Sequence, residues 1–396
     1  MDVRTGLPVV GMVGGGQLAR MTHQAAIAMG QSLRVFAGSQ DDPAALVARD
    51  VVIGSHTDLA ALRSFAAGVD VLTFDHEHVP VAHLRELVAE KVVVHPGPDA
   101  LLFAQDKLRM RHRLGTAGFP VPPFAPVSGV DDVLGFGAEH GWPVVLKAVR
   151  GGYDGRGVWL LESQEHASEL LPELLESVEL MVEQRVRMRR ELAALVARSP
   201  FGQGGAWPVV QTVQVGGICV EVLAPAPGLD AGIDEAATEL ALRVADELGV
   251  VGLLAVELFE TDDGVLVNEL ALRPHNSGHW TIEGSTTSQF TQHLRAVMDY
   301  PLGATGLVAP NVAMVNVLGA AQRPAMGVDE RLHHLFARFP EAHVHWYGKA
   351  ERPGRKVGHV TLLGEDAVRI RQRAGLAAHW LSAASWQDGY SIHQTR

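Results

Sequence analysis

Residues 143–161 read PVVLKAVRGGYDGRGVWLL, and this segment says most about how the chain folds. A glycine-rich loop separates two apolar runs, and the first run carries a single lysine, Lys147. Length and composition predict two strands joined by the loop. A lysine inside a buried strand is costly unless it has a partner. Because glycines let backbone N–H groups approach an anion closely, we predict that the loop covers phosphate groups, with Lys147 and Arg156 adding charge.

Other interpretations of this loop are weaker. It is not a Walker loop, which needs Gly-Lys-Ser/Thr at the start of a helix. An ordinary flexible hairpin with a surface arginine remains open, but the lysine in the preceding strand argues against it.

A second pair of apolar runs carries one acid in each run, Glu257 in the first and Glu269 in the second. Asp262-Asp263-Gly264 separates the runs and predicts a hairpin. A three-residue loop with Gly264 in the left-handed conformation makes the two glutamates direct cross-strand neighbours. Two like charges there favour Mg²⁺ shared with substrate phosphates, and pairing with Lys or Arg is the alternative. A two-residue Asp-Gly loop would instead place Glu257 opposite Leu270.

Two further segments are rich in hydrogen-bond donors. Residues 272–281, LRPHNSGHWT, follow the second acidic run and are interrupted by Pro and Gly. They predict a loop whose Arg273 could stabilise a transferring phosphoryl group, unless the loop is only structural. A basic cluster at residues 345–356 could hold a substrate phosphate, and a solvated charge run is the alternative.

The first hundred residues alternate short apolar runs with helical patterns, which predicts a doubly wound parallel sheet. Val92–Val94 is the last of these runs. Gly14-x-Gly16-x-x-Ala19 matches the dinucleotide fingerprint formally, but the acid expected after the second strand comes late. Binding of another phosphate-bearing ligand is favoured over NAD, and a tight turn without a ligand remains open.

Length and composition exclude or disfavour several classes of protein. The chain has 396 residues, which suggests two to three domains, and its formal charge is −12, which disfavours nucleic-acid binding. A secretory signal is not apparent, and the apolar runs are shorter than the roughly 18 residues of a membrane span. The single cysteine, Cys219, excludes an internal disulfide and is expected to be a buried, inert thiol. His76-Glu77-His78 shows no third zinc ligand by spacing, so Glu77 is expected to contact substrate instead.

Four segments together resemble one known family. They are GGGQLARM (14–21), GGYDGRG (151–157), NELALRPHNSGHW (268–280) and HWYGKAERPGRKVGH (345–359). With them the chain resembles the N5-carboxyaminoimidazole ribonucleotide synthetase family of the ATP-grasp superfamily over nearly its whole length. The last two segments distinguish it from biotin carboxylase, D-alanine ligase and glycinamide ribonucleotide relatives.

The resemblance implies an α/β fold, α+β overall, of the ATP-grasp type. Residues 1–105 would form an N-terminal Rossmann-like domain with a doubly wound parallel sheet. Residues 106–190 would form a small central lid domain, and residues 191–396 a C-terminal mixed-sheet domain that includes the basic tail. ATP would bind between the central and C-terminal domains.

The activity implied is ATP- and bicarbonate-dependent carboxylation of 5-aminoimidazole ribonucleotide through carboxyphosphate, in de novo purine biosynthesis. Another ATP-grasp carboxylate-amine ligase is the main alternative. A regulatory nucleotide-binding protein without turnover and an NAD-dependent dehydrogenase are weaker ones. The implied partners are small molecules, with neither nucleic acid nor membrane, in a cytoplasmic homodimer.

By position in the family motifs, one set of residues would bind ATP and two Mg²⁺ ions. Lys107 and Lys147 would contact phosphates, and Glu191 the ribose. Glu257 and Glu269 would hold magnesium, with Asn268 beside them. The lid loop would consist of Gly152, Tyr153, Asp154, Gly155, Arg156, Gly157 and Val158, and the hinge strand against adenine of Glu183, Gln184, Arg185 and Val186.

A second set would bind the ribonucleotide: Gly15, Gln17, Glu77, Tyr153, Asp154, Arg156, Arg273, His275, Asn276, Lys349, Arg355 and Lys356. Among these, Arg273 would stabilise the phosphoryl group, Asp154 would orient the amine, and His275 is also expected to be catalytic. Two positions depart from the family. Gln214 stands where a histidine contacts ATP, and Leu272 stands where the family has proline.

Overall fold

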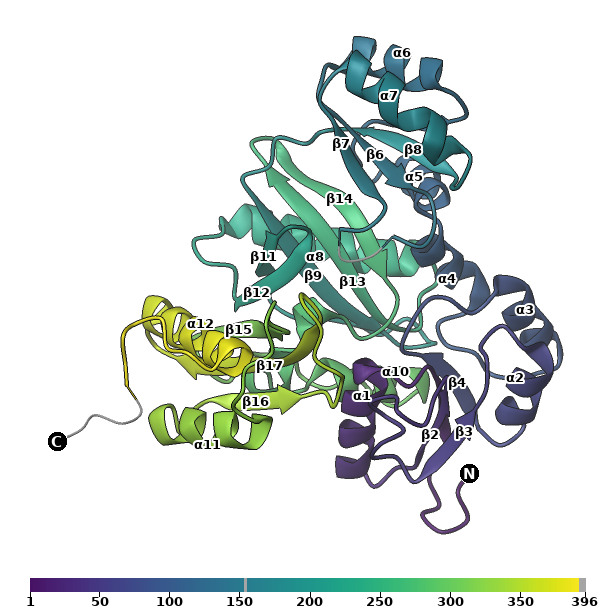
Figure 1. Cartoon of the computed structure of the whole chain (residues 1–396). Coiled ribbons are helices and arrows are strands. Elements are labelled where there is room, and N and C mark those ends of the chain that lie inside the picture. Colours follow the sequence, from purple (N-terminus) through teal and green to yellow (C-terminus); the bar gives the residue numbers. More distant parts are fainter. Residues whose placement is uncertain (153–154, 392–396) are drawn as a thin grey trace.

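The computed structural model describes residues 1–152 and 155–391, which form three sheets with their helices (Figure 1). The predicted site residues Tyr153 and Asp154 lie outside the described residues. Helices long and apolar enough to cross a membrane are absent from the described part of the chain.

The N-terminal sheet is parallel, with strand order β3-β2-β1-β4. Strands and helices alternate along this part of the chain, as the sequence predicts, because parallel neighbours need a crossover connection. Residues 92–94 do not form a full strand, since only Val94 pairs, in an isolated bridge with Leu72. The elements are β1 (Val10–Val13), α1 (Gln17–Ala28), β2 (Leu33–Ala37), β3 (Asp50–Ile53), α2 (Leu59–Ala66), β4 (Val71–Phe74), α3 (Val81–Ala89) and α4 (Pro98–Gln105).

The second sheet is antiparallel, with order β5-β8-β6-β7, and lies at the top of Figure 1 with α6 and α7. Its β6 and β7 are the two strands predicted around the glycine-rich loop. The elements are α5 (Lys107–Thr116), β5 (Phe124–Val127), α6 (Val130–His140), β6 (Val144–Ala148), β7 (Val158–Leu161), α7 (Gln164–Leu175) and β8 (Leu180–Gln184). Leu146 of β6 and Leu171 of α7 are fully buried in one core, which holds the helices to the sheet.

The third and largest sheet has order β14-β13-β9-β11-β12-β15-β17-β16, with β10 paired to β9. Its strand pairs are antiparallel, and a parallel bridge joins Gly319 to Pro353 beside them. The strands are β9 (Arg190–Arg198), β10 (Gly204–Ala206), β11 (Val210–Val215), β12 (Ile218–Ala224), β13 (Gly252–Thr261), β14 (Gly264–Ala271), β15 (Asn311–Leu318), β16 (His343–Trp346) and β17 (Lys356–Gly364). The helices are α8 (Ala231–Glu247), the 3-10 turn η1 (Asn276–Gly278), α9 (Thr281–Gly284), α10 (Gln289–Val297), α11 (Val328–Arg338) and α12 (Ala367–Ala383).

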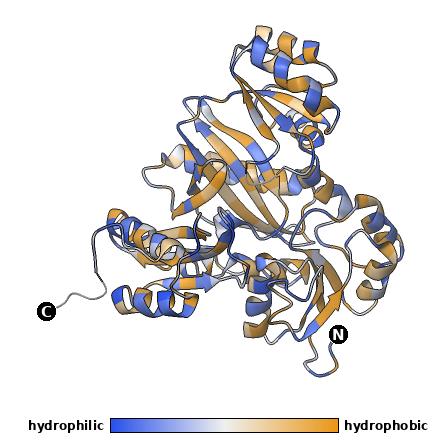
Figure 2. Ribbon diagram, viewed as in Figure 1, coloured by the Kyte–Doolittle hydropathy of each residue, from blue (hydrophilic) through white to orange (hydrophobic). Residues whose placement is uncertain are grey.

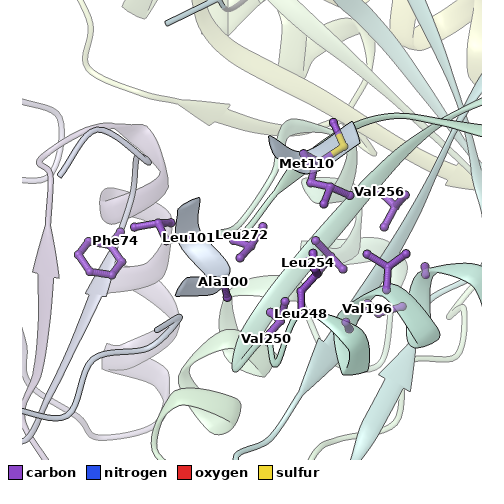
Figure 3. Close-up of a cluster of buried hydrophobic side chains, with 14 of the residues drawn as sticks. Phe74, Ala100, Leu101, Met110, Val196, Leu248, Val250, Leu254, Val256 and Leu272 are labelled. Carbon is purple, nitrogen blue, oxygen red and sulfur yellow. The ribbon is translucent and has the colours of Figure 1, made fainter. Parts of the chain in front are cut away.

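One buried core joins the N-terminal sheet to the largest sheet. Phe74 of β4 and Leu101 of α4 belong to the same apolar cluster as Leu254 of β13 and Leu272 (Figure 3). Each fully buried leucine contributes about 1.5–3 kcal/mol. Figure 2 shows the central strands as mainly hydrophobic and the outer helices as mixed. This core therefore supports β13 and β14, which carry part of the candidate site, whereas β6 and β8 pack in the core of the second sheet.

Candidate active site

A cavity of about 900 Å³ is bounded by residues of the second and the largest sheet and by Glu77, His78, Ala104 and Gln105 of the N-terminal part. Most predicted site residues line it. The predicted residues on its wall are Glu77, Lys107, Lys147, Gly152, Gly155, Val158, Glu183, Gln184, Arg185, Val186, Glu191, Gln214, Glu257, Asn268, Glu269, Arg273, His275, Asn276 and Lys356. The expected ATP and ribonucleotide sides thus share one cavity.

The β13–β14 hairpin places Glu257 directly opposite Glu269, as predicted, but by a different route. The connection is a two-residue loop, because Thr261 pairs with Gly264. Continued without interruption, that register would place Glu257 opposite Asn268. The register is restored because Asn268 is an extra, unpaired residue between the partners of Leu258 and Glu257. Such a β-bulge re-aims side chains, and here it turns Asn268 toward Lys147.

The paired glutamates have different environments. Lys107 forms an ion pair with Glu269, so this carboxylate has the basic partner that the alternative interpretation expected. Burial raises the pKa of Glu257 to about 7, and the negative charges of Glu269 and Glu191 add to the effect. Nε2 of His275 lies 3.3 Å from Oε1 of Glu257.

These carboxylates are suitable magnesium ligands only together with other oxygens. Across residues 1–152 and 155–391, no group of three or more His, Cys, Asp or Glu side chains could hold a metal ion. Mg²⁺ prefers one or two carboxylates combined with phosphate oxygens and water. The adjacent Glu257 and Glu269 therefore fit an ion that is also bound by phosphate oxygens of a nucleotide.

Lys147 belongs to a buried charge network. Its Nζ lies 2.6 Å from Oε2 of Glu183 and 3.0 Å from Oδ1 of Asn268. Arg111 also pairs with Glu183 and donates to the backbone oxygen of Asn268 at 2.7 Å. Burial alone would raise the pKa of Glu183, but Lys147 and Arg111 outweigh it and lower that pKa to about 2. The network holds Lys147 in place at the cavity wall and joins the two sheets.

Arg111 was not among the predicted site residues. It lies four residues after Lys107 on α5, so both side chains share one helix face. That spacing was the available signal. Several apolar wall residues, among them Val145, Met188 and Phe259, were also not predicted. Val145 lies two residues from Lys147 in its strand, which places the two on the same face.

The described part of the glycine-rich loop makes close backbone approaches. A Cβ on Gly155 would lie 3.0 Å from Cα of Gly217 and 3.1 Å from the oxygen of Gly216, in the β11–β12 turn. Gly155 also has a φ of +77°, which favours glycine. A Cβ on Gly152 would meet the backbone oxygen of Arg156 at 2.8 Å. The loop therefore lies against the β11–β12 turn across the cavity, and larger residues do not fit there.

The region expected to bind adenosine is partly polar. Glu183, Gln184, Arg185 and Val186 all line the cavity at the end of β8. Burial raises the pKa of Glu191, and a hydrogen bond from Gln214 opposes the shift. Cys219 also lines this wall, and burial raises the pKa of its thiol to about 12, which fits an inert residue.

Arg273 connects this cavity to a smaller one of about 410 Å³, because it lines both. Its Nε donates to Oε2 of Glu77 at 2.7 Å. Gly15 and Gln17 lie on the smaller cavity only. Gly15 and Gln17 could therefore contact the ribonucleotide only through the smaller cavity, which Arg273 also lines.

The first glycine-rich turn is packed around protein carboxylates. The N–H of Gly16 donates to Oδ2 of Asp75 at 2.5 Å, and a Cβ on Gly15 would meet Asp42 at 2.7 Å. Burial raises the pKa of Asp75 to about 6. An internal acid therefore uses the Gly16 N–H, and binding of a phosphate-bearing ligand at this turn stays a prediction.

Of the predicted residues that the structure describes, four are not on either cavity wall: Arg156, Gly157, Lys349 and Arg355. Nζ of Lys349 lies 5.9 Å from the ring centre of Tyr347, and Arg355 donates to the oxygen of Ala350 at 3.2 Å. Asn276 is on the wall, and its side chain exchanges two hydrogen bonds with Asn316, at 3.0 and 2.8 Å.

Comparison with known proteins agrees with this arrangement. Three family models match successive parts of the chain: a ribonucleotide synthetase preATP-grasp domain over residues 7–105, an ATP-grasp domain over 112–290, and a phosphoribosylaminoimidazole carboxylase C-terminal domain over 312–373. N5-carboxyaminoimidazole ribonucleotide synthase of Mycobacterium tuberculosis (strain ATCC 25618 / H37Rv) is 65% identical over 389 residues, covering 98% of this chain and 91% of that protein. The chain belongs to the N5-carboxyaminoimidazole ribonucleotide synthase family.

Solved structures of this synthase family match the fold closely. The Thermus thermophilus synthetase has a TM-score of 0.84 and 39% identity, covering 96% of this chain and 99% of that one. The Aspergillus clavatus synthase in complex with ADP and 5-aminoimidazole ribonucleotide has a TM-score of 0.85 and 30% identity, covering 94% and 98%. The ATP-grasp fold and the assignment as an ATP-dependent ligase of this synthase family, both expected from the sequence, are confirmed.

Proposed function

We propose that the protein catalyses the reaction ATP + bicarbonate + 5-aminoimidazole ribonucleotide → ADP + phosphate + N5-carboxyaminoimidazole ribonucleotide. One observation carries the proposal: Lys107, Lys147 and Glu269 line the same cavity as Arg273 and Lys356. A reaction between a nucleotide and a phosphorylated acceptor requires that both bind in one cavity. The first three residues are expected to bind the nucleotide and its magnesium, and the last two to bind the acceptor. The Aspergillus clavatus relative, solved with ADP and the aminoimidazole ribonucleotide, supports this choice of substrates.

Phosphoryl transfer comes first in the proposed mechanism. A bicarbonate oxygen attacks the γ-phosphorus of ATP, and the bond to the bridging oxygen breaks to leave ADP and carboxyphosphate. Lys147, held by Glu183 and Asn268, offsets negative charge on the phosphates. Glu257 and Glu269 would hold Mg²⁺, which supplies positive charge near the phosphates when bound.

Carboxyl transfer follows. The exocyclic amine of the ribonucleotide forms a bond to the activated carboxyl carbon, phosphate leaves, and the amine loses a proton. Arg273 is placed to stabilise the phosphoryl group because it is fixed through its Nε by Glu77 and faces the cavity. The loop that includes Gly152 and Gly155 would limit access of water to carboxyphosphate. By its position in the family motif, Asp154 would orient the amine.

ADP release is the direct test. It should be measured with ATP, magnesium and bicarbonate, with and without 5-aminoimidazole ribonucleotide. Strong dependence on the ribonucleotide, with one phosphate per carboxylated product, is expected. ADP release indifferent to it would contradict the proposal and indicate another ATP-grasp carboxylate-amine ligase.

Three accompanying properties are part of the proposal: dependence on Mg²⁺, a homodimeric state and a cytoplasmic location. The paired Glu257 and Glu269 support the first, and family expectation supports the other two. The division into domains 1–105, 106–190 and 191–396 is proposed on the same basis. EDTA should abolish ADP release and weaken nucleotide binding measured by calorimetry, and light scattering should give twice the chain mass.

A further inference from the structure

Two family-specific segments that the mechanism uses only in part meet in one buried cluster. Residues 268–280 supply His279, and residues 345–359 supply His345, Tyr347 and His359. We call these four residues the histidine cluster. The ring centres of His279 and His359 are 5.2 Å apart, and those of His359 and His345 are 4.6 Å apart. His279 and His359 are fully buried, which is unusual for histidine.

One buried amide ties the cluster to the loop that carries His275. Nε2 of Gln289 donates to Nδ1 of His279 at 2.9 Å and to the backbone oxygen of His275 at 2.8 Å. Oε1 of the same glutamine accepts from the backbone N–H of His275 at 2.8 Å. The backbone of His275, whose side chain lines the cavity, is thus fixed together with the ring of His279.

The other side of the cluster fixes the basic segment. The Tyr347 hydroxyl and Nδ1 of His359 are 2.7 Å apart, and the Tyr347 N–H donates to the oxygen of Val357 at 2.9 Å. Nε2 of His345 lies 2.6 Å from Oε1 of Glu283. The two Tyr347 bonds hold this residue against β17, whose first residue is the cavity residue Lys356, and the third bond ties His345 to α9.

An apolar core would fill this space at lower cost. Burial lowers the pKa values of His279 and His359 well below the ordinary 6.5, so both rings are neutral. A neutral ring offers one donor and one acceptor, and a buried polar atom left unpaired costs about 1–3 kcal/mol. The histidine cluster therefore serves to orient the segments that it joins, because a hydrogen-bonded network specifies orientation better than apolar packing does.

We propose that His279, Tyr347 and His359 are positioning residues that hold the Arg273–His275 loop against the basic segment 349–356 and so set the affinity for the ribonucleotide. The inference deepens the proposed function and rests on it. Lys107 and Lys147, which are expected to contact the ATP phosphates, lie on α5 and β6 and are held by Glu269 and Glu183, outside the histidine cluster. Disturbing the histidine cluster should therefore affect the ribonucleotide and spare ATP.

Tyr347→Phe and His359→Phe, singly and combined, test the proposal by removing one hydrogen bond from either end. Each should raise KM for 5-aminoimidazole ribonucleotide roughly tenfold, since small displacements of binding groups have effects of this size or larger. KM for ATP should stay within about twofold. The double variant should resemble the single ones, because all lose the same bond. His359→Asn, whose amide reaches the position of Nδ1, should restore most of the affinity.

Trp380→Phe is the matched control. It removes a buried hydrogen bond of 2.8 Å to the oxygen of Arg331, in the core on the other face of β17. Its two KM values should change together or not at all.

Several outcomes would overturn the inference. One is an equal change in KM for the ribonucleotide and KM for ATP in the Tyr347 and His359 variants. A second is that these variants leave both KM values unchanged. A third is that Trp380→Phe also raises KM for the ribonucleotide and leaves KM for ATP unchanged. In each of these outcomes ADP release by the wild type still depends on the ribonucleotide, so the proposed function is not contradicted. A wild type indifferent to the ribonucleotide would overturn both. Should His359→Phe fail to fold, Tyr347→Phe still decides the question.

Discussion

At the scale of single residues, Arg273 has the most consequential position. It lines both cavities and is oriented by Glu77. Arg273→Ala should lower kcat by about 10²–10³-fold, because it removes a preorganised charge from the proposed transition state. Steady-state ADP release would measure this. Arg273→Lys keeps the charge but loses the fork geometry, so it should recover only part of the rate. A kcat within a few-fold of wild type in Arg273→Ala would refute the role.

The buried Glu183 makes a separate prediction about stability. Glu183→Gln leaves the cations Lys147 and Arg111 without their carboxylate, which should lower the free energy of unfolding by about 3–5 kcal/mol. Urea denaturation would measure the loss. Glu173→Gln, at an exposed position on α7, should stay within about 0.5 kcal/mol of wild type. Equal stability of the two variants would mean that the network does not stabilise the fold.

At the scale of elements, the loop between β6 and β7 can be tested with two glycines of similar backbone conformation. Gly155 and Gly151 have φ values of +77° and +78°, so alanine strains both alike. Only at Gly155 would a Cβ contact the Gly216–Gly217 turn, since Gly151 has open space. Gly155→Ala should therefore uncouple ADP release from carboxylation more than Gly151→Ala does.

Proline at position 155 is a stronger test of the same loop, because the proline φ near −65° cannot match the +77° of Gly155. Gly155→Pro should abolish coupled turnover. The measurement is the ratio of ADP to carboxylated product. Unchanged coupling in Gly155→Pro would show that closure of this loop does not protect the intermediate.

At the scale of the whole molecule, buried neutral histidines connect stability to pH. Burial lowers the pKa of His293 to about 3, and its Nε2 lies 2.8 Å from Thr73 Oγ1, joining α10 to β4. Unfolded histidine titrates near 6.5. The unfolded state therefore binds more protons below that pH, so the stability is fully present above 6.5 and is lost as the pH falls toward 3.

The same histidine gives a measurable slope. Between pH 6 and 4, His293→Gln should reduce the pH dependence of the unfolding free energy by up to about 1.4 kcal/mol per pH unit. His333→Gln, at an exposed position on α11, should not reduce it. Denaturant titrations at several pH values would compare them, and identical slopes in both variants would contradict the assignment to His293.

Local sequence patterns predicted the parallel N-terminal sheet, the β6–β7 hairpin and many of the charged residues that line the cavity. These follow from alternating apolar runs, from glycine spacing and from lone charged residues in apolar strands, all of which are local in the chain. The same residue types, compared with a known family, pointed to a ligase of that family. The opposition of Glu257 and Glu269 was predicted correctly, although its stated cause, a three-residue loop, was wrong.

Other features depended on contacts between distant segments. The bulge at Asn268 restores a register that the two-residue loop alone would shift. Asp75 takes the Gly16 N–H across 59 positions of sequence, and Arg111 reaches Glu183 across 72. The sequence could show which residues carry charge and where strands run. Which partner neutralises each charge depends on which strands and helices pack together, because hydrogen bonds and ion pairs act over a few ångströms in space, whatever the separation along the chain.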